Sequence, residues 1–303
     1  MSTVVRINSE LRAWIDHNLN RGCMPQQLIE GMIVERFEPA IARGLVEAFV
    51  QARAAGTPLT GDTLTLNLAT PAYGGDLPRL APGNSIRAAD RIITVLLRVA
   101  RPTLAVLSGV LSAPECDQLI ALARPRLQPS TVVDPETGAD EVAAHRNSEG
   151  MFFGLRETPF IACLDERLSQ IMSCPIEHGE GLQVLRYGPG DQSAPHFDFL
   201  IPSNAANRQS LARSGQRISS LVVYLNDVES GGETVFPEVG VSVCPQRGNG
   251  VYFEYCDSQN QVDPRSLHAG APVIAGEKWA VTKWMRQRRF VSGTAIRHQA
   301  AGS

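Results

Sequence analysis

The segment Pro195-His196-Phe197-Asp198 carries two metal-binding side chains two residues apart. On a β-strand this spacing points both to one face, so His196 and Asp198 could share a metal ion while Phe197 points away. His268 could complete a triad of two imidazoles and one carboxylate. Such a triad leaves three positions open on octahedral iron(II), which suits a chelating keto acid together with dioxygen.

Lys278 strengthens this interpretation. It follows His268 by ten residues and begins an apolar run, Trp279 to Trp284, that is typical of a strand. A keto diacid that chelates iron through one end has a free carboxylate at the other. A buried lysine could pair with that carboxylate through charge-assisted hydrogen bonds. Without the histidine spacing, Lys278 would be read as a surface lysine at a turn.

The paired glycines Gly231-Gly232 permit a tight turn with positive φ. Thr234 follows two residues later and could aim its hydroxyl into the same pocket. Taken alone, this segment predicts only a hairpin.

Short strands between turns must position these residues. Apolar runs that favour strands cover Ile92 to Val99, Thr103 to Val110, Leu182 to Tyr187, Ile218 to Leu225, Gly250 to Tyr255 and Trp279 to Trp284. Helices are predicted after Pro114 and around Phe160 to Met172. The rhythm of the later runs favours an antiparallel β barrel or sandwich.

The first 56 residues predict a small helical module of about three helices. Glycine, proline, threonine and asparagine dominate the following stretch, so residues 57–100 are predicted to be a linker and a first strand. A strand-rich domain should then cover 101–292, and 293–303 should be a tail. The helical module could bind a partner, form a homodimer or cap the barrel, and its apolar stripes favour core packing.

The composition is that of a globular protein with a real core. Of 303 residues, 43% are hydrophobic and 19% are charged, and the net charge is −3. This balance does not indicate a nucleic-acid partner, and no apolar run is long enough to span a membrane. The N-terminal stretch, Met1 to Gly22, carries charges within an amphipathic helical pattern and does not read as a signal peptide, so a cytoplasmic protein is expected.

These motifs together resemble the catalytic domain of prolyl 4-hydroxylases, within the iron(II)/2-oxoglutarate dioxygenase superfamily. The resemblance runs from about residue 101 to 290 and includes the stretches 111–117, 145–148, 181–190, 195–198, 231–236, 263–270 and 276–284. It implies an α+β fold with a double-stranded β-helix (jelly roll) and packed helices. The N-terminal helical module lies outside it.

The resemblance also implies roles for individual residues. Iron(II) would be held by His196, Asp198 and His268. 2-Oxoglutarate would be held by Tyr187, Thr234 and Lys278. The positions that line the peptide groove in the family match Arg146, Glu180, Arg217 and Trp284. Ascorbate is the implied reductant, and the segments Val132 to Asn147 and Ile201 to Gln216 match loops that close over the site.

Two residues depart from the family pattern. Ser193 stands where relatives often have tyrosine, and Arg286 stands where they often have histidine. In the family both positions face the substrate. Arg286 could therefore recognise an acidic group, or it could be a solvated charge in a basic run.

Four functions remain open at this point. The leading hypothesis is hydroxylation of a prolyl residue in a peptide or protein. The second is hydroxylation of a free amino acid or another small metabolite. A non-catalytic jelly-roll binding module is the third, although it would be expected to lose a ligand. A cupin-like metal enzyme without 2-oxoglutarate is the fourth, and Lys278 argues against it.

Overall fold

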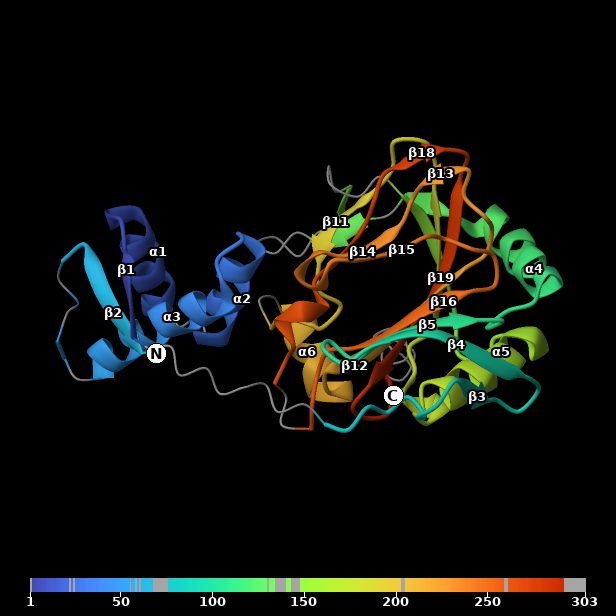
Figure 1. Cartoon of the computed structure of the whole chain (residues 1–303), viewed down its shortest axis with the longest axis horizontal. Coiled ribbons are helices and arrows are strands. Elements are labelled where there is room, and N and C mark those ends of the chain that lie inside the picture. Colours follow the sequence, from blue (N-terminus) through green and yellow to red (C-terminus); the bar gives the residue numbers. More distant parts are fainter. Residues whose placement is uncertain are drawn as a thin grey trace, which may run out of the picture. The chain divides into compact units, whose positions relative to one another are not determined.

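Figure 1 shows a computed structural model of the chain. It describes residues 2–21, 23, 25–54, 56, 57, 59, 61–67, 76–129, 131–133, 140–142, 148–202, 205–258 and 261–291. The chain forms two compact units, Met1–Gly74 and Gly75–Ser303. Among the described residues, no helix has the length and apolarity needed to cross a bilayer.

The first unit contains the three predicted helices, α1 (Ser9–Asn20), α2 (Pro25–Val34) and α3 (Pro39–Ala54). The side chain of Asn8 accepts a hydrogen bond from the Leu11 amide and so caps α1. The apolar faces of the three helices meet in a core of their own, which includes Ile15, Leu45 and Phe49. These stripes are therefore used for packing within the unit.

The first unit also contains a two-stranded sheet that the sequence reading missed. Strand β1 (Ser2–Arg6) pairs antiparallel with β2 (Thr63–Asn67). The predictions of a helical start and of a linker over the second segment are wrong there. Val4, Val5 and the alternating Thr-Leu-Thr-Leu run suit a pleated surface, and Leu66 is buried. The pairing joins segments far apart in the sequence, so no turn motif between them could predict it.

The second unit is built on one large and one small antiparallel sheet. The large sheet has the order β3-β4-β5-β16-β12-β19-β10-β9-β6. Its strands are β3 (Ser85–Arg87), β4 (Ile92–Val99), β5 (Leu104–Ser108), β16 (Gly250–Glu254), β12 (Arg217–Tyr224), β19 (Lys278–Arg286), β10 (Leu182–Tyr187), β9 (Glu149–Phe153) and β6 (Gln128–Pro129).

The small sheet has the order β11-β17-β14-β15. Its strands are β11 (Ser193–His196), β17 (His268–Gly270), β14 (Thr234–Phe236) and β15 (Val241–Val243). Two further strand pairs join β13 (Ser230–Gly231) to β18 (Val273–Ala275) and β7 (Thr131–Val133) to β8 (Asp140–Val142).

Eight of these strands form a double-stranded β-helix, which confirms the predicted fold. Along the chain, β10, β12, β16 and β19 enter the large sheet, whereas β11, β14, β15 and β17 enter the small one. The chain therefore winds back and forth between two facing sheets (Figure 1). Side chains from both inner faces meet between them, where the site lies.

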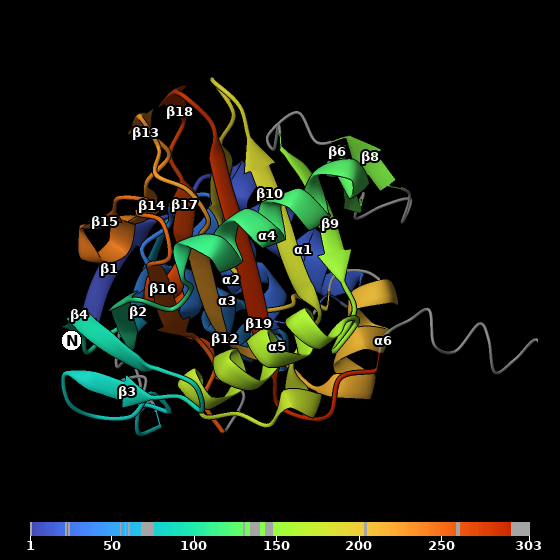
Figure 2. The same ribbon diagram turned by 90° about the vertical axis from the view of Figure 1, so that its right-hand side faces the viewer.

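Helices cover the outer face of the large sheet (Figure 2). They are α4 (Ala113–Ala123) and α5 (Pro159–Ile171), both at the predicted places. Their apolar faces, with Leu119, Leu164 and Leu168, join the core beneath the sheet. A third helix, α6 (Ala205–Ser214), lies between β11 and β12 in the sequence and belongs to the segment predicted as a loop over the site.

Strand β19 is buried along its whole length, so the side chains on both of its faces are packed inside the unit. Lys278, Ala280, Thr282 and Trp284 line the pocket between the sheets, as the two-residue period of a strand requires. The alternate residues, which include Trp279 and Val281, belong to the apolar core instead. One strand thus supplies both the core and one wall of the pocket.

Candidate active site

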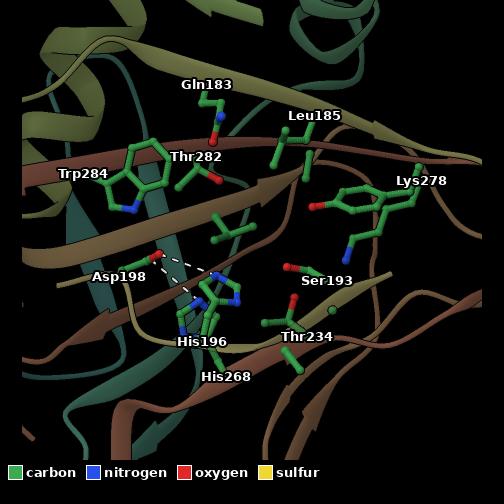
Figure 3. Close-up of a pocket in the computed structure, with 15 residues that line it drawn as sticks. Gln183, Leu185, Ser193, His196, Asp198, Thr234, His268, Lys278, Thr282 and Trp284 are labelled. Carbon is green, nitrogen blue, oxygen red and sulfur yellow. Dashed lines mark ion pairs between the residues drawn. The ribbon is translucent and has the colours of Figure 1, made fainter. Parts of the chain in front are cut away.

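The predicted triad comes together at one end of the small sheet. His196 on β11 lies directly opposite His268 on β17. One ligand atom from each of His196, Asp198 and His268 lies within 4.8 Å of the others. Figure 3 shows both imidazoles turned toward the Asp198 carboxylate. The predicted strand ends at His196, and Asp198 reaches the site from the bend that follows.

Backbone carbonyls fix the orientation of both imidazoles. His196 Nδ1 lies 2.8 Å from the Ala194 carbonyl oxygen, and His268 Nδ1 lies 3.0 Å from that of Ser266. An Nδ1–H that donates to a carbonyl leaves the lone pair on Nε2. Both Nε2 atoms lie 3.8 Å from an Asp198 carboxylate oxygen. Both histidines therefore present their metal-binding nitrogen to the same point.

Asp198 is held as a buried carboxylate. Burial alone would raise its pKa, but His268, His196 and Arg217, together with a hydrogen bond from the Ser220 hydroxyl, lower the pKa to about 2. Ser220 Oγ in turn lies 3.1 Å from the Tyr255 hydroxyl. Sequence reasoning missed Ser220, although its place on β12 two residues before Val222 puts it on the pocket face.

Two imidazoles and one ionised carboxylate on one side of an open pocket fit iron(II) with free coordination positions. Zinc in a structural site would instead be enclosed by four protein ligands, and the described residues offer three here. The triad therefore fits a metal that also binds small molecules. His196, Asp198 and His268 are the residues that would hold it.

Lys278 lies across the pocket from the triad (Figure 3). Its side chain is 5% exposed, and its Nζ lies 5.5 Å from the Tyr187 ring centroid and 5.6 Å from that of Tyr224. Burial lowers the pKa of Lys278 to about 8, while Glu233 opposes this effect. Among the described residues, no carboxylate forms an ion pair with it. A cation in this position fits the distal carboxylate of a keto diacid.

Thr234 points into the same end of the pocket. Gly231 and Gly232 have φ of 78° and 72°, which confirms the predicted positive-φ turn that leads into β14. The Tyr224 hydroxyl donates to Thr234 Oγ1 over 2.8 Å. Because Thr234 accepts this bond, its own hydrogen is left to donate to a ligand. Tyr224 carried no sequence signal beyond its place on an apolar strand.

Ser193 also lies at this end, and its expected position is corrected. It pairs with Gly270, which pairs on its other side with Thr234, so the three share one row of the small sheet. Figure 3 shows Ser193 between Lys278 and Thr234. The departure from the family pattern therefore lies beside the predicted 2-oxoglutarate carboxylate and away from the Trp284 end.

The predicted groove residues gather at the opposite end. The Arg217 guanidinium lies 4.1 Å from the Trp284 ring centroid and donates to both Glu180 carboxylate oxygens over 2.7 and 2.8 Å. It also donates to the Asp198 carbonyl over 3.3 Å. Trp284 lines the pocket itself, whereas Glu180 and Arg217 are not among its lining residues and reach it through the contact of Arg217 with the Trp284 ring. Arg146 lies outside the described residues.

Arg286 is neither a solvated charge nor a group free to recognise an acidic substrate, so both sequence interpretations are wrong. It is 1% exposed and donates to Glu180 over 2.9 Å. It also donates to the carbonyl of Ser210 within α6 and to that of Gly215, which directly follows the helix. Arg286 is the first residue of the basic run and also the last residue of β19, which is buried along its whole length. It therefore lies in the interior. Burial would raise the pKa of Glu180, but Arg217 and Arg286 together lower it.

The structure describes more of the second segment predicted to close over the site than of the first. Most of Val132 to Asn147 lies outside the described residues, apart from strands β7 and β8 and their pairing. The Ile201 to Gln216 segment contains α6, and Gln216 holds the Leu200 backbone through two hydrogen bonds. The end of the second segment is therefore anchored to the backbone that follows the metal-ligand segment.

Comparison with known proteins agrees with this geometry. Residues 182–286, which span the jelly-roll strands, match the family model of the 2OG-Fe(II) oxygenase superfamily. Prolyl 4-hydroxylase 1 of Arabidopsis thaliana is 42% identical over 202 residues, covering 62% of this chain and 70% of the relative. Probable prolyl 4-hydroxylase 3 of the same plant is 38% identical over 204 residues, covering 61% and 69%.

Among solved structures, a viral collagen prolyl hydroxylase from Paramecium Bursaria Chlorella virus-1 is 28% identical with a TM-score of 0.48, covering 60% of this chain and 95% of that one. A Pseudomonas putida prolyl-4-hydroxylase is 22% identical with a TM-score of 0.43, covering 61% and 92%. This chain matches more than two thirds of the length of both plant relatives, which establishes the family. This chain belongs to the prolyl 4-hydroxylase family and is an iron(II)- and 2-oxoglutarate-dependent dioxygenase.

Proposed function

We propose that this chain hydroxylates a prolyl residue within a peptide or protein and uses ascorbate as reductant. The observation that carries the proposal is the 42% identity to an Arabidopsis thaliana prolyl 4-hydroxylase over 70% of that protein. The site supports it, because the triad, the lysine and an aromatic wall line one pocket. The cytoplasmic location predicted from the sequence belongs to this proposal, and cell fractionation would test it.

Iron(II) and 2-oxoglutarate, when bound, supply an oxidation in which one oxygen atom of dioxygen enters a C–H bond and the other enters succinate, with release of carbon dioxide. The residues of this chain position the reactants. Lys278 would pair with the distal carboxylate, and Thr234, which accepts a hydrogen bond from Tyr224, would donate one to the same carboxylate. Trp284 forms the wall beyond Asp198, where the substrate would enter (Figure 3).

The proposal is tested by succinate formation from 2-oxoglutarate, with iron(II) and ascorbate, in the presence and absence of proline-rich peptides. Mass spectrometry of the peptides should find one added oxygen on proline, together with stimulated succinate release. Succinate without peptide oxidation would contradict the prolyl substrate and redirect the search to amino acids and other metabolites. A folded, iron-loaded protein that forms no succinate under any condition would contradict the enzymatic activity.

A further inference from the structure

One row of side chains crosses the large sheet from the pocket to the sheet's edge. Val222 pairs with Thr282, Thr282 with Gln183, and Gln183 with Phe152, on β12, β19, β10 and β9 in turn. Residues directly opposite each other on neighbouring strands point to the same face. Val222, Thr282 and Gln183 line the pocket, so Phe152 extends the same floor outward.

The pocket part of this row holds a polar atom whose hydrogen bonding is incomplete. The side-chain oxygen of Gln183 is buried and has no hydrogen-bond partner among the described residues. The indole Nε1 of Trp284, which lines the same pocket, is also buried and has no hydrogen-bond partner among the described residues. Buried polar groups in proteins are nearly always paired, so an unpaired one that faces a pocket indicates a partner that arrives with the ligand.

Phe152 ends the row as an exposed aromatic ring. Its side chain is 53% exposed, although the residues on either side of it, Met151 and Phe153, are buried. Within the part of the chain that the structure describes, β6 pairs with β9 at Glu149 and Gly150 and not at Phe152, so Phe152 lies at the sheet edge. Its ring centroid lies 6.5 Å from that of Trp284, at an interplanar angle of 34°. The exposed ring of Phe152 is thus a neighbour of Trp284, which lines the pocket.

We infer that Phe152 and Gln183 form a substrate subsite for the residues that flank the target proline. The ring of Phe152 packs against a flanking proline, because proline-rich segments dock their rings on exposed aromatic side chains. Gln183 accepts a hydrogen bond from a backbone N–H of the bound chain. The inference rests on the proposed prolyl hydroxylase function and makes the substrate an extended segment with more than one proline.

Phe152→Ala tests the aromatic half, with peptides that carry either proline or alanine immediately before or after the target proline. The wild type should prefer a flanking proline, and the variant should lose about tenfold in kcat/KM on that peptide alone. The ratio between peptides is measured on one protein, so it cancels any general loss of folding or iron. Leu122→Ala removes a partly exposed apolar side chain from α4 and is the matched control. An unchanged ratio in Phe152→Ala would overturn this half.

Gln183→Met tests the polar half, because methionine keeps the length of the side chain and removes its acceptor. Peptides with single amide bonds near the target replaced by esters remove the matching N–H. In the wild type one ester should raise KM about fivefold, and in Gln183→Met the same ester should have little further effect. Equal losses in both proteins would overturn the assignment of Gln183. A wild type that oxidises no proline peptide would overturn the proposed function and this inference together.

Discussion

Cationic side chains lie at both ends of the pocket, Arg217 and Arg286 near Trp284 and Lys278 at the other end. In the part of the chain that the structure describes, only the charges of the two arginines are balanced by a carboxylate of the protein. Arg217 and Arg286 share the Glu180 carboxylate, with contacts of 2.7 to 2.9 Å. Lys278 lies near the rings of Tyr187 and Tyr224 and, among the described residues, pairs with no carboxylate. A buried charge is costly unless it is paired. The unpaired lysine therefore indicates where an anionic ligand binds. The arginines, which are paired with Glu180, have a structural role.

Strand β19 repeats this contrast on its two faces. Lys283 is fully buried on the face away from the pocket and pairs with Asp165 over 2.7 Å. It also donates to the Glu180 carbonyl over 2.6 Å. Two lysines five positions apart on one strand thus have opposite functions. Pairing decides which of them is available to bind a ligand.

The largest effect is expected from the group that both ends of the pocket share, the triad. His268→Ala should remove one of three metal ligands, lowering iron(II) affinity and reducing succinate formation by a factor of roughly 1,000 or more. Metal binding is measured by titration with cobalt(II) and its visible spectrum, and activity by succinate release.

His17→Ala, in an exposed histidine of α1, is the control and should behave as wild type. Full activity in His268→Ala would remove the metal site from this position and with it the comparison between the two ends.

Lys278→Met should raise the KM for 2-oxoglutarate by about 100-fold, because it deletes a charge-assisted contact in a buried site. Cobalt(II) affinity should change far less, since Lys278 is not a metal ligand. The measurement is succinate formation at varied 2-oxoglutarate, next to metal titration of the same sample.

Lys283→Met is the matched control on the other face of β19. It leaves Asp165 buried without its partner, so it should lower the free energy of unfolding by about 3 kcal/mol in urea melts. Its KM for 2-oxoglutarate should stay close to wild type. If the two variants exchanged these effects, pairing would not distinguish ligand-binding from structural lysines.

This contrast explains which parts of the molecule the sequence could predict. The triad was predictable from the order of its motifs, although Asp198 lies in the bend after β11 and not on the strand that the sequence suggested. Lys278 was predictable because the two-residue period of β19 places it on the inner face of the large sheet. Nothing in the run from Arg286 to Arg289 shows that its first residue is still inside the sheet and paired with Glu180. That pairing joins positions 106 residues apart. The β1–β2 sheet was missed for the same reason, since it depends on long-range register.

Arg286→Met should destabilise the protein by about 2 kcal/mol, because Glu180 keeps Arg217 but loses its second partner. The helix α6 loses the contact at Ser210 and Gly215, so the KM for peptide should rise more than the KM for 2-oxoglutarate. Urea melts and steady-state kinetics with both substrates measure the two effects.

Arg286→Lys keeps the charge and is the conservative control, which should recover part of the stability. If Arg286→Met raised the KM for 2-oxoglutarate as strongly as Lys278→Met, the paired Arg286 would also take part in 2-oxoglutarate binding and would not be purely structural.

The smallest effect is the pH dependence of 2-oxoglutarate binding. Burial holds the pKa of Lys278 at about 8, below its ordinary value, so the cation that pairs with the carboxylate is lost as the pH rises through that point. The KM for 2-oxoglutarate should therefore rise about fourfold between pH 7 and pH 8.5 in the wild type. In Lys278→Met the same range should produce no such rise, because the titrating group is absent. A wild-type KM that stays flat to pH 9 would contradict this prediction, because Lys278 would then remain charged and burial would not have lowered its pKa.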